Sequence, residues 1–159
     1  MTPIRIAGTS TSTIDGIGIS FNIFFQGCNH NCIGCQNPTL QNFTNGHDCA
    51  TEDLLDHLAM YPDFYDSIVF TGGDPVYQPD ALYDLVTNCK ILTVLYTGFY
   101  YHEIPEHIRQ AITVIVDGPY VQSLATNGFP ASSNQQVWIR GHPISTNFQK
   151  SLTELYSGA

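Results

Sequence analysis

Short apolar runs alternate with amphipathic segments along this 159-residue chain, and that alternation restricts the fold more than any other feature. The runs at 67–71, 91–96 and 112–116 are typical of buried strands. The segments between them place their apolar residues on one helical face. Because strands that alternate with helices are joined by right-handed crossovers, the sequence predicts a mainly parallel sheet.

The remaining elements follow the same pattern. Further strands are expected at 4–7, 19–26 and 136–139, and helices at 51–61, 79–89 and 105–111. A complete eight-fold barrel needs about 250 residues, so this chain has room for fewer units. We therefore predict an α/β fold: one domain over 1–159, built as a partial, open parallel β/α barrel of about five or six strands. Its chemistry is expected at the carboxyl ends of the strands, where the loops should converge on one edge.

Charge and hydropathy exclude several classes of partner. Five Lys and Arg against fourteen Asp and Glu give a formal charge of −9, which repels phosphate backbones, so no nucleic acid is expected. No stretch approaches the ~18 to 20 consecutive apolar residues that span a bilayer. The N-terminus lacks the layout of a secretory signal. We expect a cytoplasmic protein without a membrane partner.

Three of the five cysteines, Cys28, Cys32 and Cys35, lie in one short loop with C-x3-C-x2-C spacing. In a reducing compartment, clustered thiols favour metal or redox chemistry over disulfides. Three thiolates can bind three irons of a 4Fe–4S cube and leave one iron open to a small molecule. A zinc site built on the same thiols is the alternative.

Two histidines and the two remaining cysteines could be metal ligands or residues with only a structural role. His30, His47 or Cys49 would be the fourth ligand of a zinc site. We interpret His30 otherwise as a solvent-facing loop residue and Cys49 as a packing residue that precedes a helix. Cys89 lies on the apolar stripe of a predicted helix, which indicates a buried structural thiol.

The segment from Phe25 to Asn37 resembles the cluster loop of the radical S-adenosylmethionine enzymes. Among these it is most similar to the activating proteins of anaerobic ribonucleotide reductase. Those proteins often carry a glycine before the third cysteine, as at Gly34, and an asparagine two residues after it, as at Asn37. Gln36 departs from the family, which usually has tyrosine there.

More segments extend the resemblance over most of the chain, from Ile19 to Trp138. They lie in the family's order at 70–75, 95–99, 116–120 and 132–138. Taken alone, Gly-Gly-Asp-Pro in the first of them is also an ordinary turn. The chain length suits this compact family better than the pyruvate formate-lyase activases, which share the cysteine spacing and are longer.

The resemblance implies a single radical S-adenosylmethionine domain. Cys28, Cys32 and Cys35 would bind one 4Fe–4S cluster per chain, with S-adenosyl-L-methionine on the open iron. One-electron reduction of S-adenosyl-L-methionine by the cluster would yield a 5′-deoxyadenosyl radical. This radical would remove a hydrogen from a glycine of the large subunit of anaerobic ribonucleotide reductase. A flavodoxin or ferredoxin-type protein would donate the electron. No catalytic acid or base is expected, because the cofactor carries the chemistry.

The same resemblance implies a set of cofactor contacts. They are Gly34, Cys35, Gln36, Gly72, Gly73, Asp74, Thr97 and Asp117. Gly72 and Gly73 would line the methionine end, and Asp74 would accept from its ammonium group. Asp117 would fix the ribose or, equally, form a turn with the glycine that follows it. A bulky side chain at Gly73 is therefore expected to block the cofactor and leave the cluster intact.

Two alternatives stay open. One is a radical S-adenosylmethionine enzyme that acts on a small molecule, and the other is a zinc-binding interaction module.

Overall fold

The computed structural model describes residues 2–35, 37–146 and 150–159. Its strands are β1 (Pro3–Ser12), β2 (Ser20–Phe25), β3 (His47–Ala50), β4 (Ser67–Gly72), β5 (Leu92–Tyr96), β6 (Val114–Asp117), β7 (Gln136–Ile139) and β8 (His142–Ile144). Its α-helices are α1 (Thr51–Met60), α2 (Pro79–Asn88), α3 (Glu106–Ala111) and α4 (Leu152–Ser157). Every helix and strand expected from the sequence is present. The additional elements are β3, β8 and α4.

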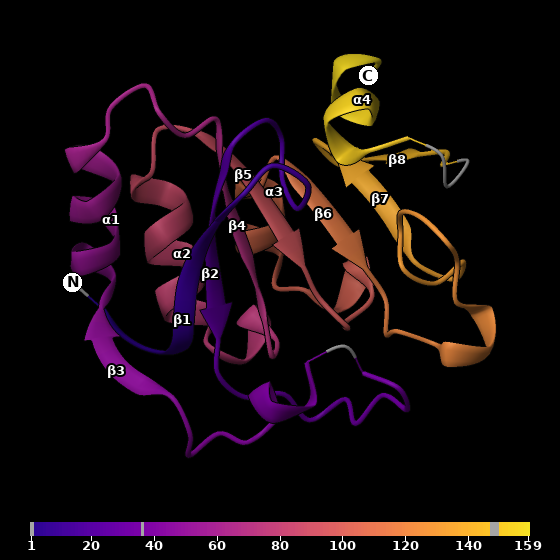
Figure 1. The fold of residues 1–159 in the computed structure, drawn as a ribbon, viewed down its shortest axis with the longest axis horizontal. Coiled ribbons are helices and arrows are strands. Elements are labelled where there is room, and N and C mark those ends of the chain that lie inside the picture. Colours follow the sequence, from indigo (N-terminus) through magenta and orange to yellow (C-terminus); the bar gives the residue numbers. More distant parts are fainter. Residues whose placement is uncertain (1, 36, 147–149) are drawn as a thin grey trace.

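All the strands in the described part of the chain form one open sheet, in the order β3-β1-β2-β4-β5-β6-β7-β8 (Figure 1). Strands β2, β4, β5 and β6 run parallel. The pairs at both edges are antiparallel. The predicted open α/β sheet is confirmed. Its strands number eight rather than five or six, because antiparallel strands extend the parallel centre on both sides.

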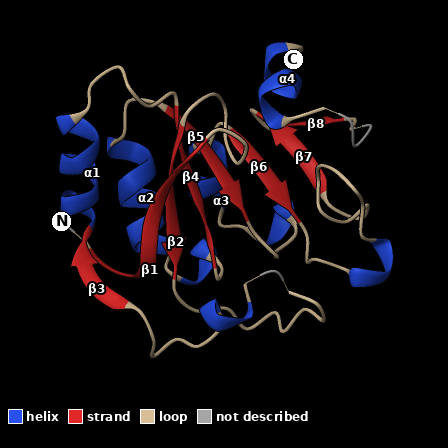
Figure 2. Ribbon diagram, in the orientation of Figure 1, coloured by secondary structure: helices blue, strands red, loops and turns tan. Residues whose placement is uncertain are grey.

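Helices α1, α2 and α3 cover one face of the sheet (Figure 2). Leu54 of α1, Leu82 of α2 and Ile108 of α3 are buried there in one core. Alternate strand residues such as Phe70 and Leu95 point into the same core. Because side chains alternate across a strand, the intervening residues point to the opposite face.

The opposite face has a smaller apolar core. Val69, Val94 and Val114 are buried on this side, with Ile17 and Leu152 of α4 packed over them. Val69 also lines the cavity described below. This cavity lies on the same face, toward the carboxyl ends of the parallel strands.

Among the residues that the structure describes, no helix is both long enough and apolar enough to cross a membrane.

Candidate functional site

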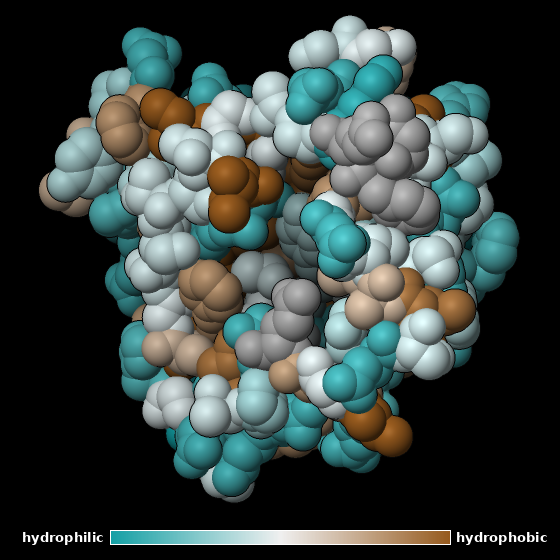
Figure 3. Space-filling model, turned by 45° about the vertical axis from the view of Figure 1, so that its right-hand side comes forward, coloured by the Kyte–Doolittle hydropathy of each residue, from teal (hydrophilic) through white to brown (hydrophobic). Residues whose placement is uncertain are grey.

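A cavity of about 520 Å³ lies on the second face of the sheet, toward the carboxyl ends of the parallel strands. Figure 3 shows the molecule hollowed on this side, with both hydrophobic and hydrophilic residues around the hollow. Residues from four separate loops line the cavity: Cys28, Cys32, Cys35, Gly72, Gly73, Thr97, Gly98 and Gly118. The predicted convergence of these loops on one edge is therefore confirmed.

The cysteine loop is closed by backbone hydrogen bonds at its two ends. The amide of Gly27 donates to the carbonyl of Leu40 at 2.7 Å, and the amide of Cys28 donates to the carbonyl of Gln41 at 3.1 Å. Within the loop, the amide of Cys35 donates to the carbonyl of Cys32 at 3.1 Å. The loop thus forms a compact arch that starts at the end of β2.

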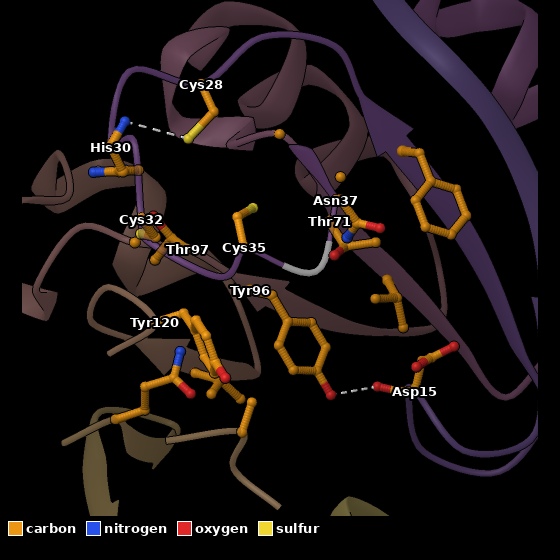
Figure 4. Close-up of a pocket in the computed structure, with 18 of the residues that line it drawn as sticks. Asp15, Cys28, His30, Cys32, Cys35, Asn37, Thr71, Tyr96, Thr97 and Tyr120 are labelled. Carbon is orange, nitrogen blue, oxygen red and sulfur yellow. Dashed lines mark hydrogen bonds between the residues drawn. The ribbon is translucent and has the colours of Figure 1, made fainter. Parts of the chain in front are cut away.

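The three thiols of this loop surround one hollow (Figure 4). All three are free and partly buried. Within the described residues, no group of three or more His, Cys, Asp and Glu side chains converges on a single metal-ion position. A cube does not require such convergence, since each thiolate would bind a different iron. The donor chemistry and the shared cavity therefore fit a 4Fe–4S cluster.

The surroundings of the Cys28 thiol shift its pKa. Burial raises its pKa to about 11, and the carboxylate of Asp74 and the other two thiols add to the increase. The backbone N–H of His30 acts in the opposite direction, because it donates to the Cys28 Sγ at 3.5 Å. In the metal-free chain this thiol keeps its proton at neutral pH, so metal binding must displace that proton.

Asp74 lies beneath the loops with a fully buried side chain. Its Oδ1 accepts from the amide of Val76 at 3.0 Å, and its Oδ2 accepts from the amide of Gly98 at 2.8 Å. The hydroxyl of Thr97 lies 2.9 Å from both oxygens. The carboxylate is therefore occupied by partners within the protein and is not part of the cavity wall. A contact between Asp74 and a ligand ammonium stays a prediction.

His30 also bonds to Asp74, which corrects the interpretation of this histidine as a solvent-facing residue. Its Nε2 lies 2.6 Å from Asp74 Oδ2, and only 16% of its side chain is exposed. The ring packs edge-on against Phe99, with centroids 4.6 Å apart. The imidazole can be buried because its hydrogen bond to Asp74 replaces the hydrogen bonds that it would make to water.

Gly72 and Gly73 line the cavity. A side chain at either position would point into neighbouring backbone and not into the cavity. Their contact with the methionine end of the cofactor stays a prediction. A Cβ on Gly73 would meet the backbone of Gly27, and would lie 2.7 Å from the Leu40 carbonyl oxygen. A Cβ on Gly72 would lie 2.5 Å from the backbone of Phe25. Both glycines allow the loop after β4 to pack directly against the cysteine loop and β2. This geometry corrects the expectation that a bulky residue at 73 would leave the cluster intact.

The remaining predicted contacts lie in different environments. Thr97 lines the cavity, whereas the carboxylate of Asp117 turns away and accepts from the amide of Tyr101 at 2.6 Å. Gly34 packs against Gln122, whose Cδ would lie 2.8 Å from a Cβ at 34. Gln36 lies outside the described residues. The cofactor roles of these four residues stay predictions.

The segment 132–138 supports the loop that follows β6. Asn134 donates its side-chain amide to the carbonyl of Pro119 at 2.8 Å, and Gln135 donates to the carbonyl of Gly118 at 3.1 Å. The Oγ of Ser132 accepts from the amide of Val121 at 3.2 Å. Two segments that carry the resemblance are thus joined to each other at the cavity rim.

Sequence analysis missed a polar group in the floor of the cavity, formed by Asp15, Asn22 and Tyr96. Asn22 donates to the Asp15 carboxylate at 2.9 Å. The Tyr96 hydroxyl donates to the Asp15 carbonyl at 2.6 Å (Figure 4). Burial, reinforced by Asp15, raises the pKa of Tyr96, so its hydroxyl stays protonated. The one available signal was Asn22, a polar residue between the apolar residues Phe21 and Ile23.

Cys49 and Cys89 both pack against the main core. Cys49 lies on the edge strand β3 opposite Ile4, together with His47. Cys89 ends α2, and burial raises its thiol pKa. The predicted packing role is confirmed for both thiols, but Cys89 is only partly buried, not fully buried as expected.

Comparison with protein families matches residues 14–138 to the family described as "4Fe-4S single cluster domain". Among individual relatives, the chain is 32% identical over 120 residues to the pyruvate formate-lyase-activating enzyme of Clostridium pasteurianum, covering 70% of this chain and 50% of that protein. It is 29% identical over 137 residues to the anaerobic ribonucleoside-triphosphate reductase-activating protein of Enterobacteria phage T4, covering 79% of this chain and 86% of that protein.

Other matches cover less of the relative. The pyruvate formate-lyase-activating enzyme of Listeria monocytogenes is 35% identical over 82 residues, which is 33% of that protein. The chain thus spans between a third and a half of the activating enzymes of pyruvate formate-lyase that it matches. Among solved structures, QueE from Escherichia coli has a TM-score of 0.47 and 19% identity, covering 60% of this chain and 52% of that chain.

Proposed function

This chain belongs to the family of 4Fe-4S single cluster domains, and from that premise we propose that it is a radical S-adenosylmethionine activase that installs a glycyl radical on the large subunit of anaerobic ribonucleotide reductase. The observation that carries the proposal is the shared cavity. Three thiols line it together with the glycines after β4 and the threonine after β5.

The chain's own residues have distinct tasks in this proposal. Cys28, Cys32 and Cys35 hold the cluster, and three ligands leave one iron without a protein side chain. Gly72 and Gly73 form the wall against which S-adenosyl-L-methionine lies. When bound, the reduced cluster and S-adenosyl-L-methionine supply a 5′-deoxyadenosyl radical that takes a hydrogen atom from the target glycine.

The floor of the cavity excludes water from that chemistry. Phe24, Val69 and Val116 line the cavity beside the polar group of Asp15, Asn22 and Tyr96. The Tyr96 hydroxyl is held in place by its hydrogen bond to the Asp15 carbonyl. No side chain needs to act as a general base, because hydrogen-atom transfer moves the proton and electron together.

The choice of target rests on how much of this chain is matched. The match to the phage T4 protein, named for the anaerobic reductase, covers 79% of this chain, whereas the matches to the activating enzymes of pyruvate formate-lyase from Clostridium pasteurianum and Listeria monocytogenes cover 70% and 49% of it. Pyruvate formate-lyase is the second candidate target, favoured by the 32% identity to the Clostridium enzyme.

The test is a mixture of the reconstituted protein, S-adenosyl-L-methionine and an anaerobic ribonucleotide reductase large subunit, reduced through flavodoxin or a ferredoxin-type protein. We expect a glycyl radical in the electron paramagnetic resonance spectrum, absent when the acceptor glycine is alanine. A signal only with pyruvate formate-lyase would replace the target. Cofactor cleavage without a radical on either protein would favour a small-molecule substrate, and a protein that takes zinc and no iron would favour the interaction module.

A further inference from the structure

We propose that His30 and Asp74 form a positioning pair that fixes the cysteine loop to the loops after β4 and β5, and thereby sets the hydrogen bond from the backbone of His30 to the Cys28 sulfur. The anchoring part of this inference is independent of the proposed function. The effect on a bound cluster rests on the proposed function.

The first observation is the number of loops that meet at one carboxylate. Asp74 belongs to the loop after β4, and its own amide donates to the carbonyl of Gly27 at 2.8 Å. Thr97 and Gly98 reach it from the loop after β5. His30 reaches it from the cysteine loop at 2.6 Å. A buried carboxylate with this many donors is held in one position, and it holds its donors in turn.

The second observation is the way in which the His30 ring is enclosed. Phe99 and Tyr77 lie at 4.6 Å and 5.7 Å from the ring centroid. A Cβ on Gly98 would lie 2.6 Å from the ring carbon Cδ2, so only glycine leaves room for it. The carboxylate accepts, so the proton of the pair is on Nε2. The ring therefore has one orientation.

The consequence concerns the main chain of the same residue. The His30 amide donates to the Cys28 Sγ at 3.5 Å (Figure 4). Hydrogen bonds to ligand sulfurs stabilise the more negative, reduced state of an iron–sulfur cluster and raise its potential. The ring of His30 contacts Asp74 and not the cluster. His30 is therefore a positioning residue, because the bond between its ring and Asp74 fixes its backbone amide beside the Cys28 sulfur.

The first experiment uses the metal-free full chain and measures amide hydrogen exchange in wild type, His30→Ala and His30→Gln. His47→Ala, an exposed histidine on β3, is the matched control. We expect His30→Ala to speed exchange of residues 27–35 by roughly tenfold or more, the factor for a lost hydrogen bond to a charged group. His30→Gln, whose amide can replace the Nε2 donor, should restore most of the protection. Equal exchange in all four proteins, or an increase spread over the whole sheet, would overturn the pair.

A double-mutant cycle tests whether His30 acts through Asp74. The exchange of residues 27–35 in Asp74→Asn combined with His30→Ala should be no faster than in Asp74→Asn alone. Additive effects would mean that His30 holds the loop by other contacts, and would overturn the assignment.

The second experiment measures the reduction potential of the reconstituted cluster. We expect a shift to more negative potential in His30→Ala, recovery in His30→Gln, and no shift in His47→Ala. Unchanged potential in an iron-loaded His30→Ala protein would overturn the effect on the cluster. Failure of the wild type to bind iron would instead overturn the proposed function, and the exchange experiment would still decide the pair.

Discussion

The backbone of Gly73 lies directly against the carbonyl of Gly27, so a side chain at 73 would press on the start of the cysteine loop. At this point the loop after β4 and the cysteine loop are thus in contact through their main chains. The contact continues through the amide of Asp74, which donates to the same carbonyl at 2.8 Å. Glycine is required here for close approach of two backbones.

Gly73→Val should therefore disturb the cluster as well as the cofactor. Overpacking of this kind costs about 1–3 kcal/mol, and the displaced loop should bind less than the full complement of iron. Urea unfolding and iron analysis of the reconstituted protein measure the two effects. Gly8→Val is the control, because nothing lies within 4 Å of a Cβ at that position. Full iron content together with normal stability in Gly73→Val would contradict this packing.

Gly98→Ala should move the His30 ring without removing it. The added Cβ would lie 2.6 Å from the ring, so the imidazole must shift away from Asp74. We expect faster amide exchange of residues 27–35 in the metal-free protein, with Gly8→Ala unchanged. Wild-type exchange in Gly98→Ala would show that the ring position does not hold the loop.

Asp117→Ala should reduce stability. The buried carboxylate accepts from the amide of Tyr101 at 2.6 Å, and a buried donor left without its partner costs about 1–3 kcal/mol. Urea unfolding of the metal-free protein measures this loss, with the exposed Asp56→Ala on α1 as the control. Unchanged stability with weakened S-adenosyl-L-methionine binding would favour the ribose contact instead.

The serine variants of the five cysteines should fall into two groups. Cys28→Ser, Cys32→Ser and Cys35→Ser remove thiols that line the cavity, so each should lose most of the iron. Cys49→Ser and Cys89→Ser alter thiols that pack against the core and should keep about four irons per chain, the content of one cube. Iron analysis after anaerobic reconstitution checks both groups. Equal iron in all five variants would place the cluster elsewhere.

The parallel centre of the fold could be predicted from the sequence because its strands are buried on both faces. Runs such as 67–72 have a continuously apolar centre, Ile68 to Phe70, and end at glycine, so their type and bounds are evident. The edge strands have no such signal. His47–Ala50 is short, with two polar exposed residues and two partly buried ones, and it forms a strand by pairing with β1. The pairing joins residues more than forty positions apart, which local pattern does not encode.

The same distinction holds at the site. The cysteines could be predicted because their chemistry and spacing lie within one short segment. The partnership of His30 and Asp74 could not, since the two residues are 44 positions apart and meet only when the loops after β2 and β4 fold together. The direction of a side chain at Gly73 likewise depends on backbone from a different loop.

The central claim is that the three thiols and the adjoining cavity support reductive cleavage of S-adenosyl-L-methionine. The most direct measurement is the 5′-deoxyadenosine formed by the anaerobically reconstituted and reduced full chain, quantified by chromatography. We predict 5′-deoxyadenosine and methionine in equal amounts from the wild type and from Cys89→Ser, and neither product from Cys28→Ser, Cys32→Ser or Cys35→Ser. An iron-loaded, reduced wild-type protein that forms no 5′-deoxyadenosine, with or without the reductase, would contradict the claim.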